Sequence, residues 1–228
     1  MLYNRQMDRV DILIDGSNFY YLALKKLGLR ATDFDFEKFA NFLADGRTIA
    51  EKGKRFYTGT VREKEGDIRT KKAMAEQTSL FTFLDKNHWE IKKSKLKTRI
   101  EEISIDNRVI DYEKILKAGI EKIIVERLRE KGVDVKLATD LIVGAVDNQY
   151  DTAIMVSSDS DLIPAIDWVR LRAKKKIEYI GFSIPDDTNP KKSTTEPLLS
   201  LIKKTDVKRI LVKSDLLQFI RHHPVVVG

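Results

Sequence analysis

The segment MVSSDSD, residues 155–161, decides the fold, because an apolar run ends there on two carboxylates. The apolar residues 152–156 predict a short buried strand. Apolar side chains then recur every three or four residues over 161–173, which predicts a helix that packs on the core. Asp159 and Asp161 therefore occupy the turn between the carboxyl end of a strand and the amino end of a helix. Ligands of open α/β sheets bind outside such turns.

Two further segments are predicted to place an acidic side chain in the same way. Residues 10–14 form an apolar strand that ends at Asp15, within the sequence DGSN that also contains Asn18. Residues 133–138 are predicted to form a strand that runs into Asp140 and then into a helix. Because the carboxyl ends of parallel strands meet at one edge of a sheet, we expect all these carboxylates to converge there.

The rest of the pattern predicts an α/β protein with a mostly parallel sheet flanked by helices. Further strands are expected at residues 54–61, 89–97, 176–182 and 208–212, with helices between most of them. Such alternation is typical of parallel sheets. Residues 98–130 interrupt the alternation and are predicted to be an insertion with a small hairpin and a helix over 113–130. We expect one domain over residues 1–183, and a C-terminal extension over 184–228 that packs on it.

Composition limits the classes of function. The chain has 228 residues, a formal net charge of +7 and a pI of about 9.3, which favours nucleic acid or another polyanion as the partner. It has no cysteine, which excludes disulfides, thiolate catalysis and thiolate zinc sites. No apolar stretch approaches the roughly 20 residues that span a bilayer, and the first ten residues do not form a signal-peptide core. We therefore expect a cytoplasmic protein with no membrane partner.

The acidic set favours a divalent cation. Two carboxylates about 4 Å apart repel by roughly 4 kcal/mol at an effective dielectric near 20, so a shared pocket needs a cation or raised pKa values. Carboxylates and water suit Mg²⁺ or Mn²⁺, and such an ion activates water for attack on a phosphodiester. Each aspartate could instead cap a helix or form a turn. The joint placement predicts metal-dependent phosphoryl chemistry by Asp15, Asp140, Asp159 and Asp161.

Two groups of basic side chains are candidates for nucleic-acid binding. Alternate positions of the strand predicted at 89–97, and of its continuation, carry the first group: Lys93, Lys95, Lys97 and Arg99. The second group follows the strand predicted at 54–61 and begins the next helix: Arg62, Lys64, Arg69, Lys71 and Lys72. As phosphate contacts they would give salt-dependent binding without sequence preference. The alternative for each group is an ordinary solvated surface.

Three segments carry a resemblance to a known family. They are VDILIDGSNFY, GVDVKLATDLIVGAV and YDTAIMVSSDSDLIPAI, and they occur in the order found in NYN domains. Over residues 10–182 the chain resembles the LabA-like branch of these domains, within the PIN-like nuclease superfamily. The resemblance implies a Rossmann-like sheet and metal-dependent cleavage of RNA.

By motif, the resemblance also implies roles for single residues. Asp15, Asp140, Asp159 and Asp161 would be the metal ligands, and Asn18 would support Asp15. Asp134 also falls on a motif position, but we interpret it as structural. Ser158 stands where the family usually has glycine.

Three functions of different classes remain open at this point. The first is a Mg²⁺- or Mn²⁺-dependent ribonuclease. The second is a non-catalytic RNA-binding regulatory module of the same fold, and the third is a metal-dependent phosphatase that acts on small nucleotides. Single-stranded DNA in place of RNA, and a homodimer in place of a monomer, are compatible with each.

Overall fold

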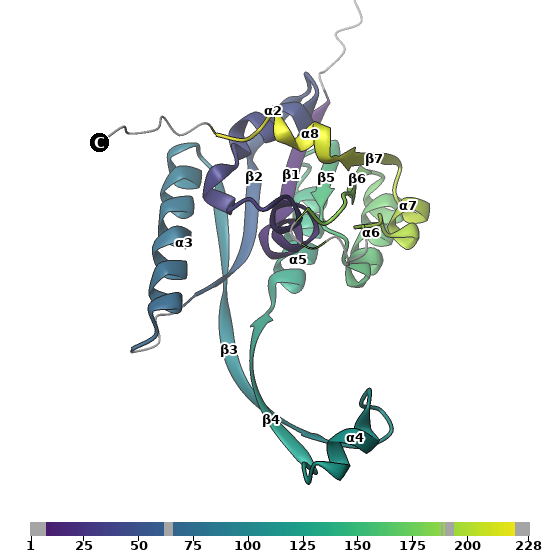
Figure 1. Ribbon diagram of the computed structural model, residues 1–228. Coiled ribbons are helices and arrows are strands. Elements are labelled where there is room, and N and C mark those ends of the chain that lie inside the picture. The colour runs from purple at the N-terminus through teal and green to yellow at the C-terminus, as the bar shows by residue number, and fades with distance from the viewer. Residues whose placement is uncertain (1–7, 62–65, 188, 190–193, 222–228) are drawn as a thin grey trace, which may run out of the picture.

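A single twisted sheet carries the fold (Figure 1). The computed structural model describes residues 8–61, 66–187, 189 and 194–221. Within these residues seven strands lie in the order β4-β3-β2-β1-β5-β6-β7, and every neighbouring pair is parallel except β3 with β4. The strands are β1 (Arg9–Asp15), β2 (Thr48–Thr60), β3 (Glu90–Ser104), β4 (Lys122–Lys131), β5 (Thr152–Val156), β6 (Lys176–Ser183) and β7 (Val207–Val212). The predicted α/β class with a mostly parallel sheet is confirmed.

Helices cover both faces of the sheet, and the pleat of β1 shows how the core is divided. Ile12 and Ile14 point into a cluster with α1 (Gly16–Phe19), α2 (Phe36–Ala44), α3 (Ile68–Lys86) and α8 (Lys213–Leu217). Leu13 points to the other face, toward α5 (Val133–Val146), α6 (Ile163–Trp168) and α7 (Leu199–Lys204). Alternate side chains of one buried strand therefore join two layers.

Short irregular turns extend two of these helices, and one short helix lies apart from the core. Helix α1 continues as a π-turn over Tyr20–Leu24 and a 3₁₀ turn over Lys25–Leu27, which ends at the left-handed Gly28. A 3₁₀ turn over Ser160–Leu162 precedes α6, and a π-turn over Val169–Ala173 follows it. A further 3₁₀ turn spans Ala31–Asp33, and α4 (Tyr112–Lys117) lies between β3 and β4. No helix among the described residues has the length and apolar character that crossing a bilayer requires.

Two predicted elements are wrong. The strand predicted at residues 133–138 is the first part of helix α5. Its buried side chains include Val133, Leu137 and Leu141, which recur every four residues, whereas Val135 is 69% exposed. The alternation of valines in GVDV resembled a strand, but the helical period over the longer segment decides the structure.

The helix predicted over residues 113–130 is the second error. Only α4 is helical there, and β4 occupies the end of the segment. The β-branched run Ile123, Ile124 and Val125 pairs antiparallel with Ile103, Glu102 and Glu101. Partnership with a strand some twenty residues earlier in the chain overrides the local pattern.

Strands β3 and β4 extend beyond the rest of the sheet as an arm (Figure 1). Strand β3 pairs with β2 only from Glu90 to Lys95, and Lys95 lies opposite Thr60, the last residue of β2. From Leu96 to Ser104 it pairs with β4 alone. The arm therefore leaves the body at the carboxyl ends of the parallel strands.

The described part of the C-terminal extension takes part in the same sheet and core. Strand β7 pairs parallel with β6, from Glu178↔Val207 to Ser183↔Val212. Leu216 and Phe219 are buried in the cluster that also holds Phe39. The extension thus supplies an edge strand and part of the helical cover.

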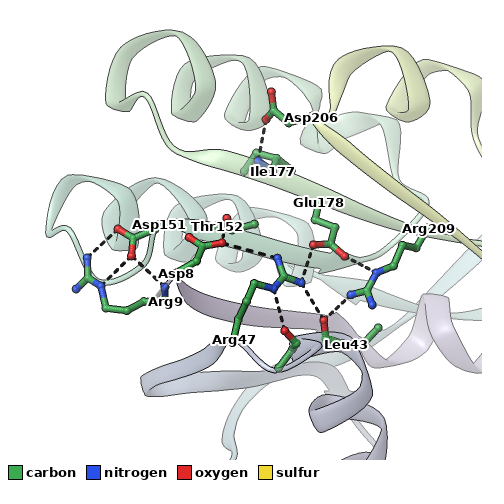
Figure 2. Close-up of polar contacts among 11 residues, drawn as sticks. Asp8, Arg9, Leu43, Arg47, Asp151, Thr152, Ile177, Glu178, Asp206 and Arg209 are labelled. Atoms are coloured by element: carbon green, nitrogen blue, oxygen red, sulfur yellow. Dashed lines mark hydrogen bonds and ion pairs between the residues drawn. The ribbon is translucent and has the colours of Figure 1, made fainter. Parts of the chain in front are cut away.

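Acidic side chains at the opposite, amino end of the sheet are paired with arginines (Figure 2). Glu178 on β6 is 1% exposed and lies between Arg47, at 2.9 Å, and Arg209, with which it makes a close ion pair. Both guanidinium groups also donate to the carbonyl of Leu43 at the end of α2. Asp151 accepts three hydrogen bonds from Arg9, which hold its pKa well below the usual range. These pairs join α2, β1, β6 and β7 at one end of the sheet.

We predict that Glu178→Ala destabilises the protein by about 3–5 kcal/mol, because two arginines then lose the buried carboxylate that balances them. Urea unfolding at neutral pH measures the change. The matched control is Lys204→Ala, which removes an exposed ion pair to Asp167 at 2.8 Å and should cost no more than about 1 kcal/mol. Equal losses for the two variants would contradict a structural role for Glu178.

Candidate functional site: a carboxylate cluster at the sheet edge

Asp15 is the buried member of the acidic cluster. It ends β1, is 5% exposed, and caps α1 by accepting a hydrogen bond from the Asn18 backbone N–H at 3.0 Å. Ser157, which follows β5, donates its hydroxyl to the Asp15 carboxylate at 3.4 Å and accepts from the Asp159 N–H at 3.3 Å. A single hydroxyl thus connects the acid after β1 with the turn that holds the acid after β5.

Asn18 fastens the same two turns together. Its side-chain oxygen accepts a hydrogen bond from the Ser158 N–H at 3.0 Å. The Ser158 hydroxyl shares a hydrogen bond with the Tyr179 hydroxyl at 2.8 Å, and its backbone lies outside the left-handed region. The serine that replaces the usual glycine therefore fits this turn and adds a contact to β6.

The glycine after Asp15 is required by close packing. A Cβ at Gly16 would lie 2.3 Å from the ring of Phe56 and 3.0 Å from the Tyr57 carbonyl oxygen. The Phe56 ring belongs to the buried core and packs edge-on against Phe36. Any larger residue at position 16 would push α1, and with it the Asp15 cap, away from β2.

Asp134 is the acid that the sequence interpretation misplaced. It lies in the first turn of α5 and is half-buried. Burial raises its pKa, and so do the charge of Asp159, a hydrogen bond between the two carboxyl groups, and the charge of Asp161. Asp134 also lines a pocket of about 290 Å³ together with Asp15 and Asn18. The structure therefore places Asp134 beside the acidic turn and the Asp15 pocket, and the structural role that we predicted for it stays a prediction.

Asp159 and Asp161 lie in the turn where the sequence placed them. Asp159 caps the 3₁₀ turn by accepting a hydrogen bond from the Asp161 N–H at 2.8 Å. The Asp159 side chain is half-buried and that of Asp161 is exposed. This hydrogen bond from the Asp161 backbone to the Asp159 side chain fixes the shape of the turn, and the charges of both acids raise the pKa of Asp134.

The oxygen donors fit a small divalent cation of the Mg²⁺ type. No three His, Asp or Glu side chains of the described residues are grouped closely enough to hold a metal ion by themselves. Mg²⁺ is commonly bound by one or two carboxylates, with waters and substrate phosphates filling its other positions. The neighbouring carboxyl groups of Asp134 and Asp159 are a donor set of that size.

Asp140 lies elsewhere, and its predicted place at a strand end is wrong. It is six residues further along α5 than Asp134, which is about 9 Å of helix and a different side of it. The buried Tyr57 hydroxyl donates to its carboxylate at 2.9 Å, and Lys92 lies at 3.5 Å. Asp140 therefore ties α5 to β2 and β3. It also lines a separate cavity of about 640 Å³ with Arg9, Arg55, Glu90 and Gln149.

The predicted basic residues have different surroundings. Arg69, Lys71 and Lys72 are exposed at the start of α3. Lys93, Lys95 and Arg99 are exposed on β3, and the Lys93 ammonium lies 4.7 Å from the centroid of the Phe81 ring. Arg62, Lys64 and the side chain of Lys97 lie outside the described residues.

Comparisons with known proteins agree with this fold. The NYN domain family matches residues 9–203. No curated protein matches the chain. Among solved structures, the chain is similar to VPA0982 of Vibrio parahaemolyticus RIMD 2210633, a protein of unknown function, with a TM-score of 0.52 and 17% identity. The alignment covers 95% of this chain and 98% of that one, and at this identity it shows the fold alone.

We predict that stability separates the two acids of α5. Asp140→Ala leaves the buried Tyr57 hydroxyl without its acceptor and should cost about 1–3 kcal/mol. Asp134→Asn should change stability by less than about 1 kcal/mol, because relief from two neighbouring acids offsets the lost attraction of a helix N-terminus for negative charge. Chemical unfolding of both variants provides the measurement. A larger loss for Asp134→Asn than for Asp140→Ala would assign the structural role to Asp134 after all.

Proposed function

Because the chain belongs to the NYN domain family, within the PIN-like nuclease superfamily, we propose that it is a Mg²⁺- or Mn²⁺-dependent ribonuclease that hydrolyses phosphodiester bonds of RNA. The proposed acids are Asp15, Asp134, Asp159 and Asp161, with Asp134 in the place that the sequence interpretation gave to Asp140. The observation that supports this most directly is the pocket that Asp15, Asn18 and Asp134 line together, next to the turn of Asp159 and Asp161, whose charges raise the pKa of Asp134.

The four acids would have different roles in the reaction. Asp134 and Asp159 would hold the ion, which supplies an activated water and neutralises charge on the phosphodiester. Asp15 lines the same pocket as Asp134 and would orient the water, and its buried carboxylate is held by Asn18 and Ser157. Asp161 is exposed and would complete the negative wall on the solvent side. Asn18 acts through its bond to the Ser158 N–H, which positions the Asp159 turn.

A groove beside the pocket suits an unpaired base. It has a volume of about 520 Å³ and is lined by Gly16, Ser17, Tyr20, Tyr21 and Gln77, among others. Tyr21 is 60% exposed and also borders the carboxylate pocket. Aromatic rings stack on bases of any identity, which suits a nuclease that cuts single-stranded RNA. We propose RNA rather than single-stranded DNA on the family relationship.

The basic residues would supply phosphate contacts. Lys93, Lys95 and Arg99 on β3 and Arg69, Lys71 and Lys72 on α3 are exposed, so a polyanion can reach them. Phosphate contacts fix the position of a nucleic acid without reading its sequence. A cytoplasmic location, the LabA-like branch and a homodimer are further proposals that rest on the sequence.

Cleavage of a labelled RNA with Mg²⁺ or Mn²⁺ tests the proposal. We expect Asp134→Asn and Asp15→Asn to lower kcat at least about 100-fold, since even residues that only orient metal ligands commonly contribute 10–100-fold. Asp140→Asn keeps an acceptor for Tyr57 and should retain activity within about threefold. RNA binding without turnover under any divalent ion would favour the non-catalytic module. Loss of activity in Asp140→Asn alone would refute the revised acid set.

Metal binding can be tested without activity. We expect Mn²⁺ at about ten times its Kd to stabilise the protein by about 1.4 kcal/mol, which raises Tm by roughly 3–6 °C for a chain of this size. Asp134→Asn and Asp159→Asn should abolish the rise in thermal melts, and Asp140→Asn should preserve it. An equal rise in all four proteins would place the ion away from this cluster.

A further inference from the structure

The arm formed by residues 95–131 leaves the sheet at the carboxyl end of the parallel strands, the end at which the acids lie. Strand β1 ends at Asp15, which lies opposite Tyr57, and β2 continues only to Thr60. Strand β3 passes this edge and continues to Ser104, with β4 as its return (Figure 1). A nucleic acid bound across the acidic edge would therefore pass the base of the arm.

The register of the arm places cations opposite cations. Three successive pairs that share a parity are Lys95↔Lys131, Lys97↔Arg129 and Arg99↔Arg127. Arg99 and Arg127 are both exposed, and Arg127 lies 3.6 Å from Glu101, the next residue of that parity on β3. Like charges directly opposite one another destabilise an antiparallel pair. The arm therefore carries a charge arrangement that folding alone does not favour.

The alternate residues of β3 and β4, which have the other parity, include apolar and acidic side chains. Ile100 lies opposite Glu126, and Glu102 lies opposite Ile124. Ile100 is 72% exposed and Ile124 is 68% exposed. Because successive residues of a strand point to opposite faces, Lys95, Arg99 and Arg127 lie on one face of the ribbon with Glu101 farther along it. Ile100, Glu102, Ile124 and Glu126 lie on the other face.

A polyanion accounts for both the position and the charge of this face. A two-stranded ribbon that leaves the body is marginally stable in water, and repulsion between opposed cations weakens it further. Phosphates along the basic face would remove that repulsion. From position 95 to position 99 the face extends about 14 Å, which is long enough for several phosphates of one strand.

We propose that the arm is an RNA anchor, which binds the phosphate backbone of the substrate outside the cleavage point through Arg99, Arg127 and Lys95. The proposal rests on the proposed function in taking RNA as the polyanion, and it adds a preference for long RNA. The anchor contributes to affinity and does not touch the reacting phosphate. It binds without sequence preference, because the contacts are to phosphates.

The test compares wild type with Arg99→Gln/Arg127→Gln by fluorescence anisotropy. Labelled unstructured RNAs of about 8 and about 30 nucleotides are titrated in EDTA, which prevents turnover, at several salt concentrations. For the long RNA we expect Kd to rise about tenfold, and the slope of log K against log salt to become shallower by about 1.4 for two lost contacts. Wild type should gain affinity as the RNA lengthens, and the variant should lose most of that gain.

Two further variants make the result specific. Lys203→Gln/Lys208→Gln removes the same charge from exposed residues on α7 and β7, at the far edge of the sheet, and should leave Kd within twofold. Arg99→Glu/Arg127→Glu should weaken binding more than the glutamine pair. Glutamine at both positions removes the opposed charges and also the ion pair of Arg127 with Glu101, which as a surface pair contributes little to stability. The ribbon should therefore keep nearly the wild-type Tm, which thermal melts verify.

Three results would overturn the anchor. The first is that Arg99→Gln/Arg127→Gln binds RNA with the affinity and salt slope of wild type. The second is that the control variant on α7 and β7 loses as much affinity as the arm variant. The third is that light scattering finds a dimer for wild type and a monomer for the arm variant. The last result would make the arm a contact between copies of the chain.

Binding in EDTA does not depend on catalysis, so the two proposals fail separately. Arm-dependent binding without any cleavage would refute the nuclease and keep the anchor. Cleavage together with arm-independent binding would refute the anchor and keep the nuclease.

Discussion

The parallel pairing of β1 with β5 is the constraint on which the rest of the site depends. Ile14 lies opposite Val156, so the residues that follow, Asp15 and Ser157, leave the sheet side by side. One serine hydroxyl and one asparagine amide then suffice to fix both turns. Neither turn alone could hold this geometry, because a short loop has too few contacts of its own to resist repulsion between neighbouring acids. The buried strands supply the rigidity and the loops supply the chemistry.

Acidic side chains have opposite surroundings at the two ends of the sheet. At the amino end, Glu178 lies between two arginines and Asp151 accepts hydrogen bonds from Arg9. Asp11, buried within β1, is paired with Arg55 at 2.7 Å, although burial still raises its pKa. At the carboxyl end, the neighbouring charges of Asp159 and Asp161 raise the pKa of Asp134. Acids that face arginines hold the fold together, whereas acids that face acids store electrostatic free energy that a cation can release.

Helix α5 carries one acid of each kind, Asp134 near other acids and Asp140 near a tyrosine and a lysine. Its first turn carries Asp134 to the carboxylate cluster, and about 9 Å later Asp140 fastens the same helix to Tyr57 on β2 and Lys92 on β3. These contacts of Asp140 restrict how far the first turn of α5 can move relative to the sheet. An acid of the carboxylate cluster and an acid that fastens the helix therefore occur six residues apart in the segment GVDVKLATD. Only their partners in space distinguish them.

The amino-acid sequence by itself determined the α/β class, the parallel strands at residues 10–14 and 152–156, and the acids Asp15, Asp159 and Asp161 at their ends, because strand period and turn position are local properties. Tertiary structure decided the rest. The segment GVDV is helical because Val133, Leu137 and Leu141 fill one side of the core, and this helix brings Asp134 beside the turn of Asp159 and Asp161. Residues 122–131 are a strand because β3 offers them a long partner. Such choices depend on contacts between distant segments, whose energies exceed the small local preferences that a sequence pattern expresses.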